Sequence, residues 1–436
     1  MDDDDDKKDM KPRGTGCGCQ PAENESKTFV WHGDRSPLYD FPNNEINITE
    51  KWPRGFGQIT QAGKMQAFQL GQFLRNRYFS LVGDRYHPDD IYMLTSDYDR
   101  TIVTALLVLS GLYPAKERWH SSIDWDPVPL RTIPHEIDNI IAFTAKCPKY
   151  EHQLDCYRYH GTGRMLDANY TKFYAYLSNH TGIPLHELNF EKVNDVFDTL
   201  YVQDVHKLGV PKWAKQHAYE GQEHYLMRKI SEYTFSSLTY NEIAMNLRGG
   251  PVMREIMRNF EAHTQQQHSS HNRISKFKLR LYSGHDSTIA TILQVFGVYN
   301  HQLVPYTGTV LIELYKRSYK TDEPSCPQIP DPFSDMYFIK FFYKNCTTQN
   351  LLYEIPLPDC RDITESSDIN FRPSCSIKKL RQVMRSVLQG DWYQQCKYKS
   401  NCCGSCASFK KSGSDFSKFE YESSVSATMQ WLRACL

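Results

Sequence analysis

Short apolar runs alternate with amphipathic segments near the start of the 436-residue chain. Residues 28–31 are β-branched and aromatic, which predicts a buried strand that ends at a glycine. A helix is expected over 61–80, with Thr60 as its N-cap. A second strand at 91–94 is followed at once by a helix at 101–109. Strands and helices that alternate with short connections predict a parallel sheet with crossover helices.

The same alternation returns in the last third of the chain. Apolar residues alternate with Lys and Arg over 277–282, which predicts a strand with one buried face. A helix is expected over 287–296, where it ends at Gly297. Two further strands are expected at 309–315 and 336–343. The two ends of the sequence therefore build one α/β unit.

The segment between these two parts has a different composition. Residues 116–271 are rich in His, Tyr and charged residues, with helical stretches and long polar connections. We predict an α/β fold with a mostly parallel, doubly wound sheet core over 27–115 and 272–396, interrupted by a largely helical cap at 116–271. Residues 1–26 are expected to be a charged tail, and 397–436 a second tail rich in Ser, Lys and Cys.

Charge and hydropathy exclude two kinds of partner. Lys plus Arg and Asp plus Glu each number 51, so the formal net charge is zero. A protein whose whole surface binds nucleic acid needs a clustered cationic excess, so no nucleic acid partner is expected. No stretch approaches the roughly 20 apolar residues that a membrane span requires. An anionic substrate would therefore be captured in a local basic pocket.

Signals for the cellular compartment conflict. The opening residues, MDDDDDKKD, lack the basic start and apolar run of a secretory signal. Thirteen cysteines nevertheless fit an oxidising compartment. Five Asn-x-Ser/Thr sequons point the same way: Asn24, Asn47, Asn169, Asn179 and Asn345. We expect a lysosomal or secreted protein whose N-terminus is not the native one, either because of an attached tag or because of a wrong gene model; a solvated acidic tail is the alternative.

Three polar clusters each follow a predicted strand. They are residues 32–37 (His-Gly-Asp-Arg-Ser-Pro), 95–100 (Thr-Ser-Asp-Tyr-Asp-Arg) and 284–286 (Gly-His-Asp). Open α/β sheets build their sites outside the carboxyl ends of their strands, so these clusters are expected to meet. Together they supply two histidines, two arginines and a carboxylate. A single histidine after a strand is more often a structural residue, but three complementary clusters are much harder to dismiss.

This set of side chains suits phosphoryl transfer without a metal. A neutral imidazole can attack phosphorus and hold it covalently, which divides one difficult step into two. Arginines match phosphate oxygens with forked donors and neutralise charge in the transition state. A nearby carboxylic acid can protonate the departing oxygen and then deprotonate the attacking water.

The clusters resemble those of the histidine acid phosphatases, and of the lysosomal and prostatic branch in particular. That branch pairs an Arg-His-Gly-x-Arg-x-Pro opening with a late His-Asp. Similarity extends to 52–60, 96–101, 304–306 and 313–315, and overall from about residue 27 to residue 396. The resemblance implies an α/β sheet domain with a helical cap that hydrolyses phosphomonoesters at acid pH. It also implies a small-molecule or protein phosphomonoester substrate, no metal or other cofactor, and a homodimer.

The resemblance also implies a role for each site residue. His32 would be the nucleophile that accepts the phosphoryl group, and Asp286 the proton donor. Arg35 and Arg100 would bind the phosphate, and His285 would hydrogen-bond its oxygens.

Position 31 departs from the family pattern. The family carries an arginine before the nucleophile, whereas this chain has Trp31. Loss of one charged donor to the transition state typically lowers the rate by about 10²–10³. An alternative function is therefore a catalytically inactive protein that keeps the fold and binds phosphorylated ligands. A transferase similar to phosphoglycerate mutase shares the His-Gly opening, but the late His-Asp, the long cap and the cysteines argue against it.

The cysteines divide into two groups. Those in the family-like region are disulfide candidates, and the sequence does not fix their pairing: Cys147, Cys156, Cys346, Cys360, Cys375 and Cys396. The resemblance suggests a bond between Cys147 and Cys375. The tail cluster at 402–406 contains a Cys-x-x-Cys, but no second pair lies at zinc-ligand spacing, which favours a non-metal role.

Overall fold

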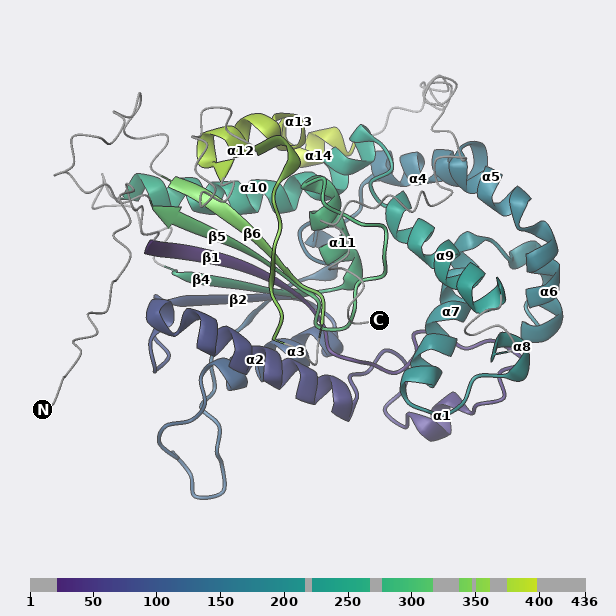
Figure 1. The fold of residues 1–436 in the computed structure, drawn as a ribbon, viewed down its shortest axis with the longest axis horizontal. Coiled ribbons are helices and arrows are strands. Elements are labelled where there is room, and N and C mark those ends of the chain that lie inside the picture. The colour runs from purple at the N-terminus through teal and green to yellow at the C-terminus, as the bar shows by residue number, and fades with distance from the viewer. Residues whose placement is uncertain are drawn as a thin grey trace, which may run out of the picture.

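The computed structural model describes residues 22–215, 222–266, 277–316, 337–346, 350–360 and 375–397. Figure 1 shows a twisted sheet with helices against both faces and an arc of further helices beyond one end of the strands. The expected α/β class with a helical portion is confirmed. Most of the two expected tails and the cysteine cluster at 402–406 lie outside the described residues.

Four parallel strands form one half of the sheet. They stand in the order β3-β2-β4-β1. Their bounds are Ala22–Trp31 for β1, Ile91–Ser96 for β2, Arg131–Ile133 for β3 and Leu279–Gly284 for β4. Because they are parallel, the carboxyl ends of β2, β4 and β1 lie at the same edge. The three polar clusters follow these three strands.

The other half of the sheet is antiparallel. Next to β1 lies β5, followed by β6, which pairs with both β7 and β8. Their bounds are Thr309–Lys316 for β5, Tyr337–Lys344 for β6, Tyr353–Glu354 for β7 and Cys375–Ser376 for β8. The sheet is thus mixed, whereas the sequence predicted a mostly parallel one. Apolar strand patterns look alike in both directions, so they do not reveal strand orientation.

Strand β1 begins at Ala22, five residues before the expected start of structure. The early part escaped the sequence pattern because it carries charged residues inside the fold. Glu25 and Lys27 are fully buried and form an ion pair with each other. A buried charge is tolerated when it is paired, and this pair gives a strand a polar sequence.

Helices cover the two faces of the sheet (Figure 1). On one face, α2 (Gln61–Val82) and α3 (Asp99–Leu112) pack against Val30 and Leu281. As predicted, Thr60 caps α2 by accepting a hydrogen bond from the backbone N–H of Gly63. On the other face, α10 (Glu242–Gln266) and α11 (Asp286–Val295) pack against the alternate residues of β1, which include Trp31.

The remaining helices form two groups. One group packs around α10: α12 (Ile377–Val383), α13 (Arg385–Leu388) and α14 (Trp392–Gln395). The other forms the arc in Figure 1 and has its own apolar core: α4 (Pro148–His160), α5 (Thr162–Asn169), α6 (Thr171–Thr181), α7 (Phe190–Val205), α8 (Lys212–Lys215) and α9 (Gln222–Ser237). Short elements complete the fold: α1 (Ile48–Lys51) and the 3-10 helices His135–Ile137, Leu185–Glu187 and Pro358–Cys360.

The expected cap range of 116–271 contains elements of the core. Strand β3 pairs with β2, and α10 packs against the sheet. We therefore propose that the cap comprises α4 to α9, residues 148–237. No helix in the described ranges is both long and apolar enough to cross a membrane.

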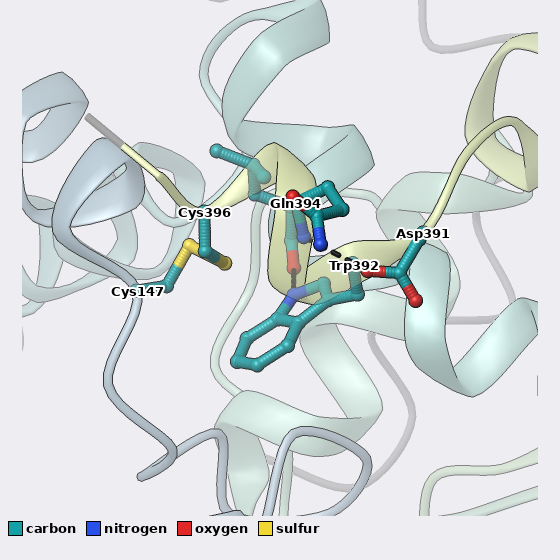
Figure 2. Close-up of a disulfide and its surroundings, with 6 residues drawn as sticks. Cys147, Asp391, Trp392, Gln394 and Cys396 are labelled. Atoms are coloured by element: carbon teal, nitrogen blue, oxygen red, sulfur yellow. Dashed lines mark hydrogen bonds between the residues drawn. A yellow bond between two sulfur atoms is a disulfide. The ribbon is translucent and has the colours of Figure 1, made fainter. Parts of the chain in front are cut away.

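Disulfides join Cys147 to Cys396 and Cys360 to Cys375, so the suggested bond between Cys147 and Cys375 is wrong. Figure 2 shows the first bond, which links the N-cap of α4 to the end of α14 beside Trp392. The indole N–H of Trp392 donates to the carbonyl oxygen of Leu247 at 2.8 Å. The pairing depends on α14 returning across α10, which no local pattern in the sequence reveals.

We expect loss of the Cys147–Cys396 bond to destabilise the fold more than loss of Cys360–Cys375. The bonds close loops of 249 and 15 residues in sequence separation. Loop-closure entropy then predicts a difference of about 2.5 kcal/mol in the free energy of unfolding. Urea unfolding of the two double Cys→Ser variants measures it. Equal losses would show that loop length is not what these bonds contribute.

Candidate active site

The last paired residues of two neighbouring strands set the position of the two site histidines. Trp31 at the end of β1 stands opposite Gly284 at the end of β4. The backbone N–H of His32 donates to the carbonyl oxygen of Gly284 at 3.1 Å. The rings of His32 and His285 consequently lie with their centroids 5.7 Å apart. Strand register alone therefore brings the first and third polar clusters together.

Hydrogen bonds assign the tautomer of His32. Its Nδ1 lies 2.9 Å from the carbonyl oxygen of Gly33, an acceptor, so Nδ1 carries the proton. Its Nε2 receives two donors at 3.1 Å, the Nε–H of Arg100 and the indole N–H of Trp31. Nε2 therefore presents a lone pair, which is the form of imidazole that can act as a nucleophile.

The surroundings of His32 keep it neutral. Burial lowers the pKa of its imidazole well below the ordinary value, and the positive charges of Arg100 and Arg35 lower it further. The side chain is 2% exposed. A histidine with a normal pKa would be protonated in acid and would lose its lone pair. The lowered pKa of His32 favours the neutral form, which retains the lone pair, further into the acid range than in an ordinary histidine.

Gly33 is required by close packing against α2. A Cβ atom at this position would lie 2.2 Å from the carbonyl oxygen of Gly63 in the first turn of that helix. The backbone N–H of Gly33 also donates to Thr104 in α3. The loop after β1 is thus clamped between two helices.

The second cluster contributes Arg100, which lies between the two histidines. Its Nε donates to His32, and its terminal nitrogen lies 3.4 Å from Nδ1 of His285. The ring of Tyr98 stacks beneath the guanidinium, with a separation of 4.5 Å. On the far side, Nε2 of His285 bonds to the hydroxyl of Ser96 at 3.0 Å. Both ring nitrogens of His285 are therefore engaged within the site, as both are in His32.

Arg35 is held by a partner that the sequence did not reveal. Its two terminal nitrogens bind the carboxylate of Asp198 in α7 at 2.9 and 2.8 Å. Burial alone would lower the pKa of Arg35, but Asp198, Tyr306 and Asp286 together outweigh it and the pKa is raised. The Nε atom is buried and has no hydrogen-bond partner among the described residues. A buried, unpaired donor of this kind suits an anionic ligand.

Asp286 is the first residue of α11. Its carboxylate accepts a hydrogen bond from the backbone N–H of Ser287 at 2.6 Å. Burial raises the pKa of the carboxyl group above its ordinary value, although Arg35 and Arg100 oppose the change. Part of the population therefore keeps its proton at pH values where an exposed aspartate would have lost it.

The chain matches a known protein family. The family model described as the histidine phosphatase superfamily (branch 2) matches residues 27–344. The chain belongs to this branch of the histidine phosphatases. Lysosomal acid phosphatase of Xenopus laevis is 28% identical over 388 residues, which cover 87% of this chain and 80% of the relative. Prostatic acid phosphatase of Homo sapiens is 29% identical over 373 residues, which cover 84% and 85%.

Solved structures share the fold of this histidine phosphatase. Apo phytase of Hafnia alvei aligns with a TM-score of 0.57 at 16% identity, covering 89% of this chain and 100% of that one. Phytase of Citrobacter braakii gives a TM-score of 0.57 at 14% identity, covering 86% and 100%. The fold that the family resemblance implied is confirmed.

Trp31 distinguishes this histidine phosphatase from the family pattern. The side chain is 5% exposed and stacks on Tyr306, with ring centroids 4.6 Å apart and an interplanar angle of 27°. Its indole N–H points at Nε2 of His32. An uncharged donor therefore occupies the position beside the expected nucleophile, and the site has one positive charge fewer than the family motif.

The structure brings together the five residues that the sequence predicted. His32, Arg100 and His285 are joined by hydrogen bonds, whereas Arg35 and Asp286 act on each other through their charges. Sequence reasoning gave no site role to three neighbours. Asp198 and His206 lie in no recognisable motif, and Tyr306 belongs to the family-like stretch 304–306, which was not linked to the site. Among the described residues, no group of three or more His, Cys, Asp or Glu side chains is arranged to hold a metal ion.

Proposed function

We propose that this chain is an acid phosphatase that hydrolyses phosphomonoesters through a phosphohistidine at His32. The observation that carries the proposal is the unprotonated Nε2 of His32, buried beside two arginines. Similarity to lysosomal and prostatic acid phosphatases supports the same reaction class. The physiological substrate is a small-molecule or protein phosphomonoester.

In the first step, the Nε2 lone pair of His32 forms a bond to phosphorus. The bond between phosphorus and the ester oxygen breaks, and Asp286 gives its proton to that departing oxygen. Arg100 and the unpaired Nε of Arg35 neutralise charge on the phosphoryl oxygens. The products of this step are an alcohol or phenol, a phosphohistidine and an aspartate carboxylate.

In the second step, water attacks the phosphohistidine. The Asp286 carboxylate takes a proton from the water as the new phosphorus–oxygen bond forms. The bond between phosphorus and Nε2 breaks, and its electron pair returns to His32 as the lone pair. Inorganic phosphate leaves, and both residues recover their starting protonation states.

Hydrolysis of an aryl phosphate across the acid and neutral range tests the proposal. Asp286 must be protonated in the first step, and its pKa is raised. Turnover should therefore be present in acid and fall as the pH rises through that raised pKa. Asp286→Asn should lower turnover and lose this dependence. A wild-type rate that rises steadily from acid to alkaline pH would contradict Asp286 as the proton donor.

A second candidate function is phosphate-ester binding without turnover. The observation that favours it is the indole N–H of Trp31, which occupies the lone pair that must attack. Calorimetry with inorganic phosphate distinguishes the two functions, because a silent binding protein would bind phosphate and release no product from an aryl ester.

Location and assembly follow from the same proposal. We infer a lysosomal or secreted glycoprotein, supported by the disulfides and by lysosomal relatives. Homodimerisation is part of the proposal only because the family resemblance implies it. The sequon residues Asn47, Asn169 and Asn179 are exposed, which suits glycosylation, whereas Asn345 is 5% exposed. Sedimentation velocity determines whether the chain dimerises.

A further inference from the structure

One face of the cap helix α7 contacts the chain segment that follows the site histidine. Four of its side chains bond to residues of the segment 34–44: Asp198, Thr199, Gln203 and His206. Their spacing of one, four and three residues places them along one side of a helix. The segment 34–44, called here the phosphate loop, begins two residues after His32.

Two of these contacts reach consecutive residues of the phosphate loop next to the site. Asp198 binds Arg35 with both carboxylate oxygens, and one oxygen also accepts the backbone N–H of Leu38 at 3.3 Å. Two turns later, at the C-cap of α7, Nε2 of His206 lies 2.8 Å from a carboxylate oxygen of Asp34. The helix therefore holds the loop at two adjacent points.

The contact with Asp198 determines which N–H groups of Arg35 remain available to a ligand. A guanidinium has five N–H donors in a fixed fork. Asp198 accepts one N–H from each terminal nitrogen, the carbonyl oxygen of Ser36 accepts another from Nη1 at 3.3 Å, and the buried Nε is left without a partner among the described residues. If Asp198 lost its charge, the fork could turn away from this orientation, although Arg35 itself would be unchanged.

The contact with His206 anchors the residue before Arg35. The Asp34 carboxylate is fully buried and also accepts the hydroxyl of Thr60, the N-cap of α2. The edge of the Trp52 ring, just after α1, packs against His206 with centroids 5.7 Å apart. Among the described residues that surround His206, the charged group facing its ring is Asp34. The neighbours Trp52 and Thr60 are neutral.

We propose that α7 positions the phosphate loop from the cap, with Asp198 and His206 as positioning residues, so that the cap sets the phosphate affinity of the site. This proposal rests on the proposed function, since it takes the ligand to be phosphate. It assigns both residues to the site although neither touches the reacting atoms.

The contact with His206 also makes the positioning dependent on pH. The hydrogen bond to Asp34 raises the pKa of His206 above its ordinary value of 6.5. The charged pair is therefore complete in acid, and it is lost as the pH rises through that raised pKa. Phosphate affinity should fall in the same pH range.

The first test compares Asp198→Asn with Asp195→Asn by calorimetry with inorganic phosphate. Asp195 lies one turn earlier on α7 and pairs with Lys192 on its own helix. Asp198→Asn should weaken phosphate binding and lower kcat/KM by about 100-fold, the typical effect of a misplacement near 1 Å. Asp195→Asn should stay within about twofold of wild type, because its carboxylate pairs with Lys192 on its own helix and not with Arg35. Asp198→Glu, which restores the charge, should recover part of the loss.

The second test follows the ratio of wild-type to variant phosphate affinity across pH. His206→Gln keeps a neutral donor and removes the titrating group, so the ratio should be large in acid and approach one above the raised pKa of His206. The matched control is His186→Gln, because that side chain is 83% exposed in the cap. Its ratio should not change with pH.

Failure of the inference and failure of the proposed function give different results. A wild-type chain that binds phosphate but hydrolyses no ester would refute the proposed function, while the affinity ratios would still test the inference. Wild-type phosphate affinity in Asp198→Asn, or a His206→Gln ratio that is constant with pH, would overturn the inference. Near-UV circular dichroism and thermal melts confirm folding, and Asp198→Glu and His206→Gln keep the test decisive if Asp198→Asn unfolds.

Discussion

Replacement of His32 by alanine is expected to abolish turnover of phosphomonoesters and the formation of any covalent phosphoenzyme. The two site histidines are both buried and both held neutral, and the lone pair of each faces an N–H of Arg100, but only His32 matches the nucleophile position of the family motif. In His285, Nε2 bonds to the hydroxyl of Ser96 and Nδ1 faces a terminal nitrogen of Arg100. Loss of a nucleophile typically lowers kcat by four orders of magnitude or more, so we expect a fall of about 10⁴-fold or greater.

Rapid acid quenching with a labelled aryl phosphate measures this prediction. Phosphohistidine should appear in the wild-type protein and disappear in His32→Ala, and peptide mapping should place it at residue 32. His186→Ala provides the control, because its side chain is exposed on the cap. Label that is retained in His32→Ala, or that maps to His285, would show that His32 is not the nucleophile.

Trp31→Arg is expected to raise kcat/KM for an aryl phosphate by about 10²–10³. Two physical effects contribute to the gain. The substitution removes an indole N–H that shares the lone pair of His32, and it adds a charged fork beside the phosphoryl group. Steady-state kinetics at about pH 5, where a general acid is still protonated, measures the change.

Trp31→Phe separates the two effects. Phenylalanine keeps a ring to stack on Tyr306 but has no N–H, so it frees Nε2 of His32 without supplying a charge. A rise that equals that of Trp31→Arg would show that the hydrogen bond, and not the missing charge, limits the rate. Equal rates in all three proteins would show that the mechanism tolerates tryptophan. No turnover in any of them would favour the phosphate-binding function.

The fold was largely predictable from the sequence where apolar periodicity reports burial. Residues 61–80 and 101–109 lie inside the observed α2 and α3, and the strand expected at 91–94 lies inside β2. The start of β1 was not predictable. Glu25 and Lys27 form an ion pair inside the core, and in the sequence alone these charged residues look like part of a polar tail. Strand direction and the disulfide partner of Cys147 depend on tertiary paths that leave no local pattern.

The proximity of the candidate site residues to one another was predictable from the sequence, whereas their contacts with the cap were not. His32, Arg100 and Asp286 follow strands whose carboxyl ends share one edge of the sheet, so spacing alone placed them together. Asp198 and His206 lie on a helix 163 and 172 residues from their partners in the chain. A carboxylate and a histidine on an amphipathic helix are typical of its solvent-exposed face, so no signal in the sequence distinguished Asp198 and His206 from other polar residues.

The bond between Cys147 and Cys396 imposes an order of events on the biosynthesis of the chain. The two cysteines are 249 residues apart, so the second leaves the ribosome roughly 12 to 50 s after the first at synthesis rates of about 5–20 residues per second. During this interval Cys147 is a thiol at the entrance to the cap, with Cys156 only a short helix away. The native disulfide can form only after the last helix of the described chain has been synthesised. An earlier disulfide between Cys147 and Cys156 would have to be broken by thiol–disulfide exchange before Cys147 could bond to Cys396 at α14.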